Sequence, residues 1–344
     1  MSLHSFTKMC LYDYYLVMDI RAIESRSQLM KAMRNWFSHH DYLEVDTPIV
    51  SADLIPEPTI QNFSTRLISE FLGEKELYLV PSPEVFMKKI IAATHRSVYQ
   101  FSHCFRNSEQ IGDYHNPEFT MLEYYTVDVD EQDSIDITER LFAQTALPST
   151  VDSLLPPFRR MTVAEACKRY AGVDLDAVQS MNKIREAAIS LGLQLPSAPE
   201  RWEDTFNRIF LNFVEPNLPQ DKPLVLEDYP VQIECLAKRK ENSPYKRRWE
   251  LYAHNVELAN CYAEETDATV IRQYYEEQYR LLCAERANTA KVIPDIDPFF
   301  ADMFEQNYPK CSGVALGFDR LLMLQMGRKN LRGVILFPLS DIIS

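Results

Sequence analysis

Two apolar-flanked runs joined by a polar loop, between residues 98 and 128, constrain the fold of this chain more than any other feature. The first run is VYQFSHCFR, which ends at Arg106, and the second is EFTMLEYYTVD. Runs of aromatic and β-branched residues around such a loop predict a pair of β-strands. Alternate residues of a strand share one face, and on the second strand these are Phe119, Met121, Glu123 and Tyr125.

The chemistry of that face suits a ligand with two parts. A flat ring, a carboxylate and a phenol in a row would fit a flat heterocycle beside an amine. Arg106, on the partner strand, could hold a carboxylate or phosphate with two parallel hydrogen bonds. Taken singly, each residue is equally typical of a charged antiparallel hairpin with cross-strand aromatic pairs. The complete set favours a binding site.

The same segment resembles a known signature. R-N-x-E followed by H-N-P-E-F-T-M-L-E-x-Y is similar to the second motif of class II aminoacyl-tRNA synthetases, in its lysyl form. The resemblance implies that Arg106 contacts the substrate carboxylate and α-phosphate and that Phe119 stacks on adenine. It implies amino-acid contacts for Glu123 and Tyr125.

Within the loop of this motif, the resemblance also implies ATP contacts. They fall on Glu109 and His115. Ser108 precedes Glu109 where the family usually has R-N-E, so it is interpreted as a one-residue insertion.

The segment before this hairpin resembles the first motif of the same family. RAIESRSQLMKAMRNWFSHH predicts an amphipathic helix with Ile23, Met30, Met33 and Phe37 on one stripe, flanked by Leu29 and Trp36. DYLEVDTPIV then predicts a strand that enters Pro48. In class II enzymes this motif forms the dimer interface, so the resemblance implies a homodimer.

Glu84 lies in the first turn of a predicted helix. ELYLVPSPEVFMKKIIAA indicates a strand, a turn and that helix. An acidic residue there could simply complement the positive end of the helix. The family resemblance offers a second role, contact with the amino group of the substrate.

A second acidic hairpin is predicted from ELYAHNVELANCYAEETD, with a two-residue turn at His254-Asn255. This turn would place Tyr252 opposite Glu257 and Glu250 opposite Ala259. Glu250 and Glu257 would then be diagonal neighbours, and their repulsion would favour a cation between them, with Mg²⁺ suited to oxygen ligands and phosphate. The alternative is a pair of solvated glutamates.

The same strand carries an amide, a ring and a carboxylate at alternate positions: Asn260, Tyr262 and Glu264. Their parity is opposite to that of Glu257, so a β-bulge is needed before all four residues can line one pocket. The run resembles E-x-x-N-G-F-x-E of the lysyl branch. That resemblance implies metal binding by Glu250 and Glu257 and amino-acid binding by the other three, with Cys261 in place of Gly.

The third signature, CSGVALGFDRLLMLQMG, predicts a buried strand followed by a helix. Arg320 falls in the first turn, where the helix dipole disfavours a cation unless an anion or an acid such as Asp319 is near. The pattern resembles the third class II motif, in which Gly317 and Arg320 would bind ATP, with Arg320 on the γ-phosphate. Ala315 replaces a usual Gly in the amino-acid pocket, as is typical of the elongation factor P–lysine ligases, a truncated lysyl branch.

The resemblance implies an α+β fold of class II catalytic type, a largely antiparallel sheet of about six or seven strands flanked by helices. We expect a single domain over residues 1–344, with a mostly helical insertion around 130–222. Only about 20 residues precede the first helix, so no anticodon-binding domain is expected.

Composition narrows the partners and the compartment. The net charge of −14 argues against tRNA, which requires clustered basic residues; the one basic run, KRKENSPYKRR, is typical of a solvated loop. Seven cysteines without a C-x-x-C pair, no long apolar run and no secretory signal indicate a cytoplasmic protein with no membrane span.

Together, the signatures lead to one functional expectation and two alternatives. The resemblance implies a ligase that uses ATP and Mg²⁺ to activate lysine or β-lysine as an adenylate. It would then transfer the aminoacyl group to a lysine side chain of elongation factor P. A minimal aminoacyl-tRNA synthetase and a non-catalytic regulator that binds ATP or an amino acid remain as alternatives. The sequence does not distinguish α- from β-lysine.

Overall fold

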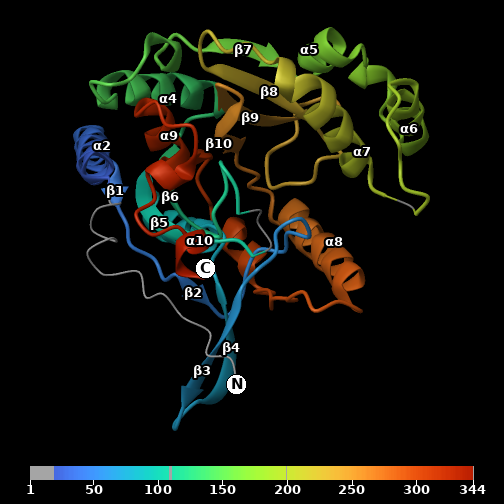
Figure 1. Ribbon diagram of the computed structural model, residues 1–344. Coiled ribbons are helices and arrows are strands. Elements are labelled where there is room, and N and C mark those ends of the chain that lie inside the picture. The colour runs from blue at the N-terminus through green and yellow to red at the C-terminus, as the bar shows by residue number, and fades with distance from the viewer. Residues whose placement is uncertain (1–18, 108–110, 199, 344) are drawn as a thin grey trace, which may run out of the picture.

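The computed structural model describes residues 19–107, 111–198 and 200–343. Its main element is an eight-stranded sheet, antiparallel except for the outermost pair at each edge, β1–β5 and β7–β8 (Figure 1). In sheet order, the strands are β1 (Leu43–Glu44), β5 (Val98–Phe105), β6 (Glu118–Val127), β11 (Cys311–Gly317), β10 (Val256–Ala263), β9 (Tyr245–Ala253), β8 (Leu224–Pro230) and β7 (Arg159–Thr162).

The α+β class and the largely antiparallel sheet are therefore confirmed, but the expected strand number was too low. The additional strands are short edge strands that pair in parallel. β1 has 2 residues and β7 has 4, and β7 lies within the segment expected to be mostly helical. Such short runs carry no clear alternating pattern, because their pairing depends on a neighbour distant in sequence.

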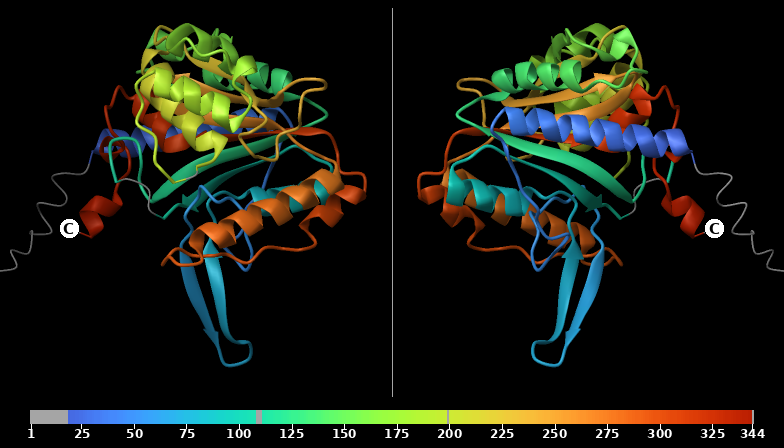
Figure 2. Two further views of the ribbon diagram at one scale, coloured as in Figure 1. Left: turned by 90° about the vertical axis from the view of Figure 1, so that its right-hand side faces the viewer. Right: turned by 90° about the vertical axis from the view of Figure 1, so that its left-hand side faces the viewer.

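One face of the sheet is covered by α2 (Ile20–His39), α4 (Glu131–Thr145) and α9 (Phe318–Gln325) (Figure 2). The α2 helix begins where the Asp19 carboxylate accepts a hydrogen bond from the Ala22 amide. Its buried stripe includes Leu29 and Trp36, which were expected only to flank it. Ile23 and Met30, predicted within the stripe, are only half-buried.

The opposite face is covered at its two ends by different helices. α3 (Glu84–Thr94) and α8 (Ala268–Arg286) share one hydrophobic core with Val98 and Tyr125. A second core, against Leu224 and Tyr252, holds α5 (Val163–Ala166), α6 (Met181–Ser190) and α7 (Trp202–Ile209) from the inserted segment. The middle strands β6, β11 and β10 line a cleft on this face.

A smaller sheet of β2 (Val50–Ser51), β4 (Gly73–Leu79) and β3 (Ser64–Ser69) forms a hairpin that projects from the body (Figures 1 and 2). The strand predicted over DYLEVDTPIV is thus only partly present: its residues form the short strands β1 and β2, with Pro48 between them. Proline donates no backbone hydrogen bond, so it breaks a continuous strand.

The remaining elements are short. Helix α10 spans Leu339–Ile342, and 3-10 or π-helical turns occur at Asp152–Leu154, Cys167–Ala171, Leu175–Ala177, Phe210–Val214, Glu215–Asn217, Phe300–Glu305 and Leu331–Gly333. Among the described residues, no helix combines the length and apolar character that crossing a bilayer requires.

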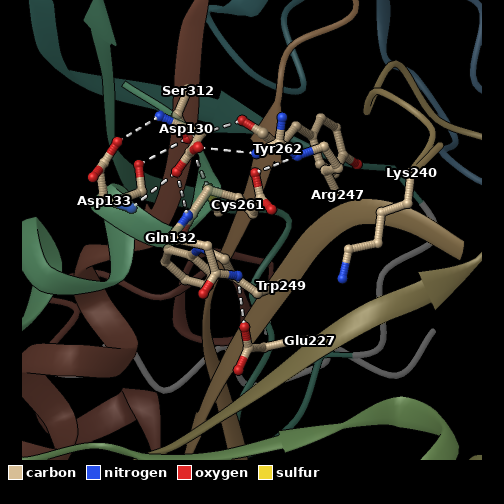
Figure 3. Close-up of polar contacts among 12 residues, drawn as sticks. Asp130, Gln132, Asp133, Glu227, Lys240, Arg247, Trp249, Cys261, Tyr262 and Ser312 are labelled. Atoms are coloured by element: carbon tan, nitrogen blue, oxygen red, sulfur yellow. Dashed lines mark hydrogen bonds and ion pairs between the residues drawn. The ribbon is translucent and has the colours of Figure 1, made fainter. Parts of the chain in front are cut away.

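Polar contacts join α4 to the back of the central strands (Figure 3). Trp249 donates its indole N–H to the carbonyl of Glu131 at 2.8 Å, and the Cys261 sulfur lies 3.1 Å from the Ser312 hydroxyl. Burial raises the pKa of the Cys261 thiol well above its ordinary value. Cys261 therefore packs into the core on the side of α4 and, despite replacing a glycine, does not line the cleft.

Candidate active site

A β-bulge in β10 brings the second acidic hairpin into the cleft. The pairs Ala253–Val256 and Tyr252–Glu257 match the prediction, and His254 and Asn255 adopt the positive φ that the turn requires. The register then shifts between Glu257 and Ala259. The bulge that the opposite parities required is therefore present.

The same bulge makes one predicted pair wrong. Glu250 lies opposite Asn260, not opposite Ala259, because the bulge inserts one extra residue into β10. Glu250 is buried. Its carboxylate accepts hydrogen bonds from the hydroxyls of Tyr229 at 2.5 Å and Tyr252 at 2.7 Å, and it pairs with Arg248. Because it is buried, the alternative of a solvated glutamate does not describe Glu250. Glu250 also lines neither cavity of the cleft.

The larger cavity of the cleft has a volume of about 220 Å³ and opens between β6, β10 and α9. Here the Arg106 guanidinium lies 5.3 Å from the centre of the Phe119 ring, and its buried Nε has no hydrogen-bond partner among the described residues. Of the predicted site residues, this cavity is lined by Arg106, His115, Phe119, Glu257, Asn260, Ala315, Gly317 and Arg320. Glu109 lies outside the described residues.

Arg320 is directed into this cavity by backbone contacts. It donates from Nη1 to the Glu257 carbonyl at 2.9 Å and from Nε to the Tyr114 carbonyl at 3.0 Å. Its nearest carboxylate is that of Glu257 at 3.9 Å, since Asp319 instead pairs with Arg26 at 2.5 Å. Desolvation within the cleft and the neighbouring Glu250 raise the pKa of Glu257 to about 7.

The smaller cavity, of about 80 Å³, adjoins the first and is acidic. Arg106, Met121, Asn260 and Ala315 line both cavities, so the two form one continuous cleft. The predicted amino-acid-binding residues all line this second cavity: Glu84, Glu123, Tyr125, Asn260, Tyr262, Glu264 and Ala315. We call it the acidic compartment.

A buried lysine that the sequence analysis missed organises the compartment. The side chain of Lys88 is 1 % exposed, and its ammonium lies 2.5 Å from Glu84 and 2.8 Å from Glu264. Burial alone would lower the pKa of Lys88, but the two carboxylates raise it above its ordinary value. The available signal was the four-residue spacing of Glu84 and Lys88 on one helix, which brings such pairs together. Glu84 thus holds Lys88 and also lines the compartment.

The acidic compartment is lined by more carboxylate side chains than cationic ones. Tyr125 donates its hydroxyl to Glu123 Oε1 at 2.8 Å, whereas the buried Oε2 has no hydrogen-bond partner among the described residues. Burial, with the neighbouring Glu84, raises the pKa of Glu123 to about 8. Burial also raises the pKa of Glu264 to about 7. Raised carboxyl pKa values indicate a site prepared for a cation, because an entering ammonium would favour the charged form.

These raised pKa values predict how stability changes with pH. Folding raises the pKa of Glu123 from 4.5 to about 8 and that of Glu264 from 4.5 to about 7. Between these values the folded protein binds more protons than the unfolded chain, so the free energy of unfolding should fall as the pH rises. Thermal denaturation of the ligand-free protein at pH 6 and 8.5 measures this fall. Glu123→Gln should reduce it, and an identical fall in the variant would contradict the assignment.

Comparisons with known proteins identify the family of this chain. Residues 18–341 match the family model for class II tRNA synthetases (D, K and N). An elongation factor P–(R)-β-lysine ligase from Hamiltonella defensa is 34 % identical, over 92 % of this chain and 94 % of that protein. The corresponding ligase of Proteus mirabilis is 32 % identical, over 95 % of this chain and 97 % of its own length.

A lysine–tRNA ligase from Moorella thermoacetica is 35 % identical over 91 % of this chain, which spans only 64 % of that longer protein. The family model covers nearly all described residues, including every strand of the cleft. The chain belongs to the class II tRNA synthetase family, in the group that contains the D, K and N enzymes.

Proposed function

We propose that this protein is an AMP-forming ligase that activates lysine or β-lysine with ATP and transfers it to a lysine side chain of elongation factor P. The observation that carries the proposal is the acidic compartment, which adjoins the larger cavity and shares Arg106 with it. A diamino acid in this compartment would direct its carboxylate toward Arg106. Similarity to elongation factor P–(R)-β-lysine ligases over more than nine-tenths of their length supports the acceptor.

In the first half-reaction, a carboxylate oxygen of the amino acid attacks the α-phosphorus of ATP, and the bond to pyrophosphate breaks. The carboxylate is already ionised, so no general base is required. Arg106 would neutralise charge where the new bond forms, and Arg320 would neutralise the departing phosphates. Positioning and charge neutralisation of this kind supply most of the rate enhancement in such transfers. In the second half-reaction, an acceptor amine attacks the carbonyl carbon of the mixed anhydride, the bond to AMP breaks, and the amine nitrogen releases a proton to solvent as the amide forms.

The residues present fit a magnesium ion that enters with ATP. Among the described residues, no three His, Cys, Asp or Glu side chains gather into a metal cluster. Mg²⁺ usually needs only one or two carboxylates beside phosphate oxygens and water. Glu257 faces the larger cavity and would provide the direct contact, while the buried Glu250 would add negative charge behind it. When bound, the ion would neutralise phosphate charge in the transition state.

A protein acceptor is favoured over tRNA by the net charge of −14, which opposes binding to a polyanion. The second candidate, a lysine–tRNA ligase, is favoured by the 35 % identity to the Moorella protein. We further propose that the ligase is a cytoplasmic homodimer, as expected from the first motif and from the free state of its six described cysteines.

Pyrophosphate exchange over a panel of amino acids, with and without elongation factor P, tests the proposal. We expect exchange that depends on lysine or β-lysine, and a mass increase of one lysyl group on elongation factor P. Charging of tRNA that weakens steeply with salt would instead support the second candidate. ATP binding with neither exchange nor modification would indicate the regulator.

A further inference from the structure

The acidic compartment contains a carboxylate that none of the three signatures includes. Glu57 lines the compartment together with Ser82 and Glu84, and it comes from the loop between β2 and β3. No hydrogen bond or ion pair joins its side chain to another described residue, although the charges of Arg106, Lys88 and Arg248 act on it. Burial, followed by the nearby charge of Glu84, raises the pKa of Glu57 to about 7.

The loop holds Glu57 in a fixed position. Glu57 stands between the buried residues Pro56 and Pro58, and proline fixes the backbone φ angle. The buried Arg286 of α8 donates hydrogen bonds to the carbonyls of Pro58 at 3.1 Å and Ile60 at 2.5 Å. A buried, charged side chain that donates hydrogen bonds to two loop carbonyls indicates that the fold holds the loop in one conformation.

The same loop is tied to the strand end that carries Arg106. The Asn107 amide donates to the Gln61 carbonyl at 2.8 Å, so the loop passes directly beside the residue that follows Arg106. Arg106, Glu84 and Lys88 are among the charges that act on Glu57, and Glu84 and Lys88 also act on Glu123. Glu57 thus reaches the compartment from the loop that passes beside Arg106, whereas Glu123 reaches it from the middle of β6.

Two carboxylates of the acidic compartment are available to pair with a ligand. Lys88 bridges Glu84 and Glu264. Glu123 and Glu57 feel the charge of Lys88, but neither forms an ion pair with an ammonium group among the described residues. A diamino acid carries two ammonium groups, one far from its carboxylate and one near it. Matching these two carboxylates to the two ammonium groups of a diamino acid rests on the function proposed above.

We propose that Glu57 is a substrate-binding residue that receives the ammonium group nearest the reacting carboxylate of the amino acid. Glu57 thereby selects diamino acids over acids that carry only the distal amine. The distal ammonium lies with Glu123 and Glu264, and Arg106 holds the carboxylate between the two cavities.

The test compares Glu57→Gln with the unaltered protein, using lysine, β-lysine and 6-aminohexanoate, which lacks the ammonium near the carboxylate. In pyrophosphate exchange, the variant should raise KM for the reactive diamino acid by about 10- to 100-fold, as expected for a lost charge-assisted contact. The KM for ATP should change by less than about twofold. The affinity for 6-aminohexanoate, measured by calorimetry, should be unchanged.

Two further variants separate binding from folding. Glu57→Asp, which keeps the charge, should recover part of the lost affinity, and Glu76→Gln on the exposed hairpin should behave as the unaltered protein. Calorimetric titration of lysine and β-lysine decides the assignment even if no adenylate forms, so failure of the proposed function is distinguishable. Three results would overturn it: equal weakening of the bound diamino acid and 6-aminohexanoate, unchanged affinity for that diamino acid, or binding of neither lysine nor β-lysine by the unaltered protein.

Discussion

Replacing Arg106 by alanine should reduce lysine-dependent pyrophosphate exchange by about a thousandfold or more, as for loss of a principal charge-stabilising group. Arg106 lines both cavities, and its buried Nε has no hydrogen-bond partner among the described residues. Its place at their junction is where a substrate carboxylate would meet the α-phosphate. Loss of the guanidinium would leave the developing charge without a neutralising partner.

Two arginine variants make this prediction specific. Arg106→Lys keeps the charge but not the two-pronged geometry, so an intermediate loss is expected. Arg34 also lies over an aromatic ring, 5.2 Å from the centre of Phe101, but it is exposed and pairs with Glu44 away from the cleft. Arg34→Ala should leave exchange within about twofold, since exposed ion pairs contribute little. Exchange by Arg106→Ala at a rate near that of the unaltered protein would remove the assignment.

Gly313→Ala should disrupt the acidic compartment although it adds a single methyl group. On β11, Gly313 lies opposite Tyr125 on one side and Tyr262 on the other. A Cβ atom there would overlap the Tyr125 ring and lie 2.6 Å from a Glu264 oxygen. Both side chains would have to move. We expect a loss of about 100-fold or more in kcat/KM for the amino acid and a destabilisation of about 1–3 kcal/mol from overpacking.

ATP binding distinguishes this local effect from general unfolding. Gly313 does not line the larger cavity, so the variant should still bind ATP with nearly unchanged affinity in calorimetry. Gly112→Ala serves as the matched control, because a Cβ atom at Gly112 would meet no described atom within 4 Å. If Gly313→Ala activated lysine normally, the packing described for Tyr125 and Glu264 would be wrong.

The sequence predicted the elements whose pattern is local. The strands around Arg106 and Glu123, the turn at His254-Asn255 and the helix that begins at Glu84 all appear as expected. Each has a periodicity or a turn signal within a few residues. The parity argument also required a bulge before Asn260, and the structure contains one.

The features that were missed depend on contacts distant in sequence. The register at Glu250 was wrong because the position of a bulge follows from packing between strands. Lys88 was interpreted only as part of a helix, since its burial requires Glu264 from β10. Glu57 belongs to no motif, and the loop that carries it is anchored by Arg286, which is distant in sequence.

The most direct test of the central claim is a crystal structure of this protein with a non-hydrolysable lysyl-adenylate analogue. We predict the adenine ring against Phe119 in the larger cavity and the α-phosphate mimic on Arg106. The side-chain ammonium should lie in the acidic compartment beside Glu123 and Glu264. An analogue bound with its aminoacyl group outside that compartment, or bound away from the cleft, would contradict the account.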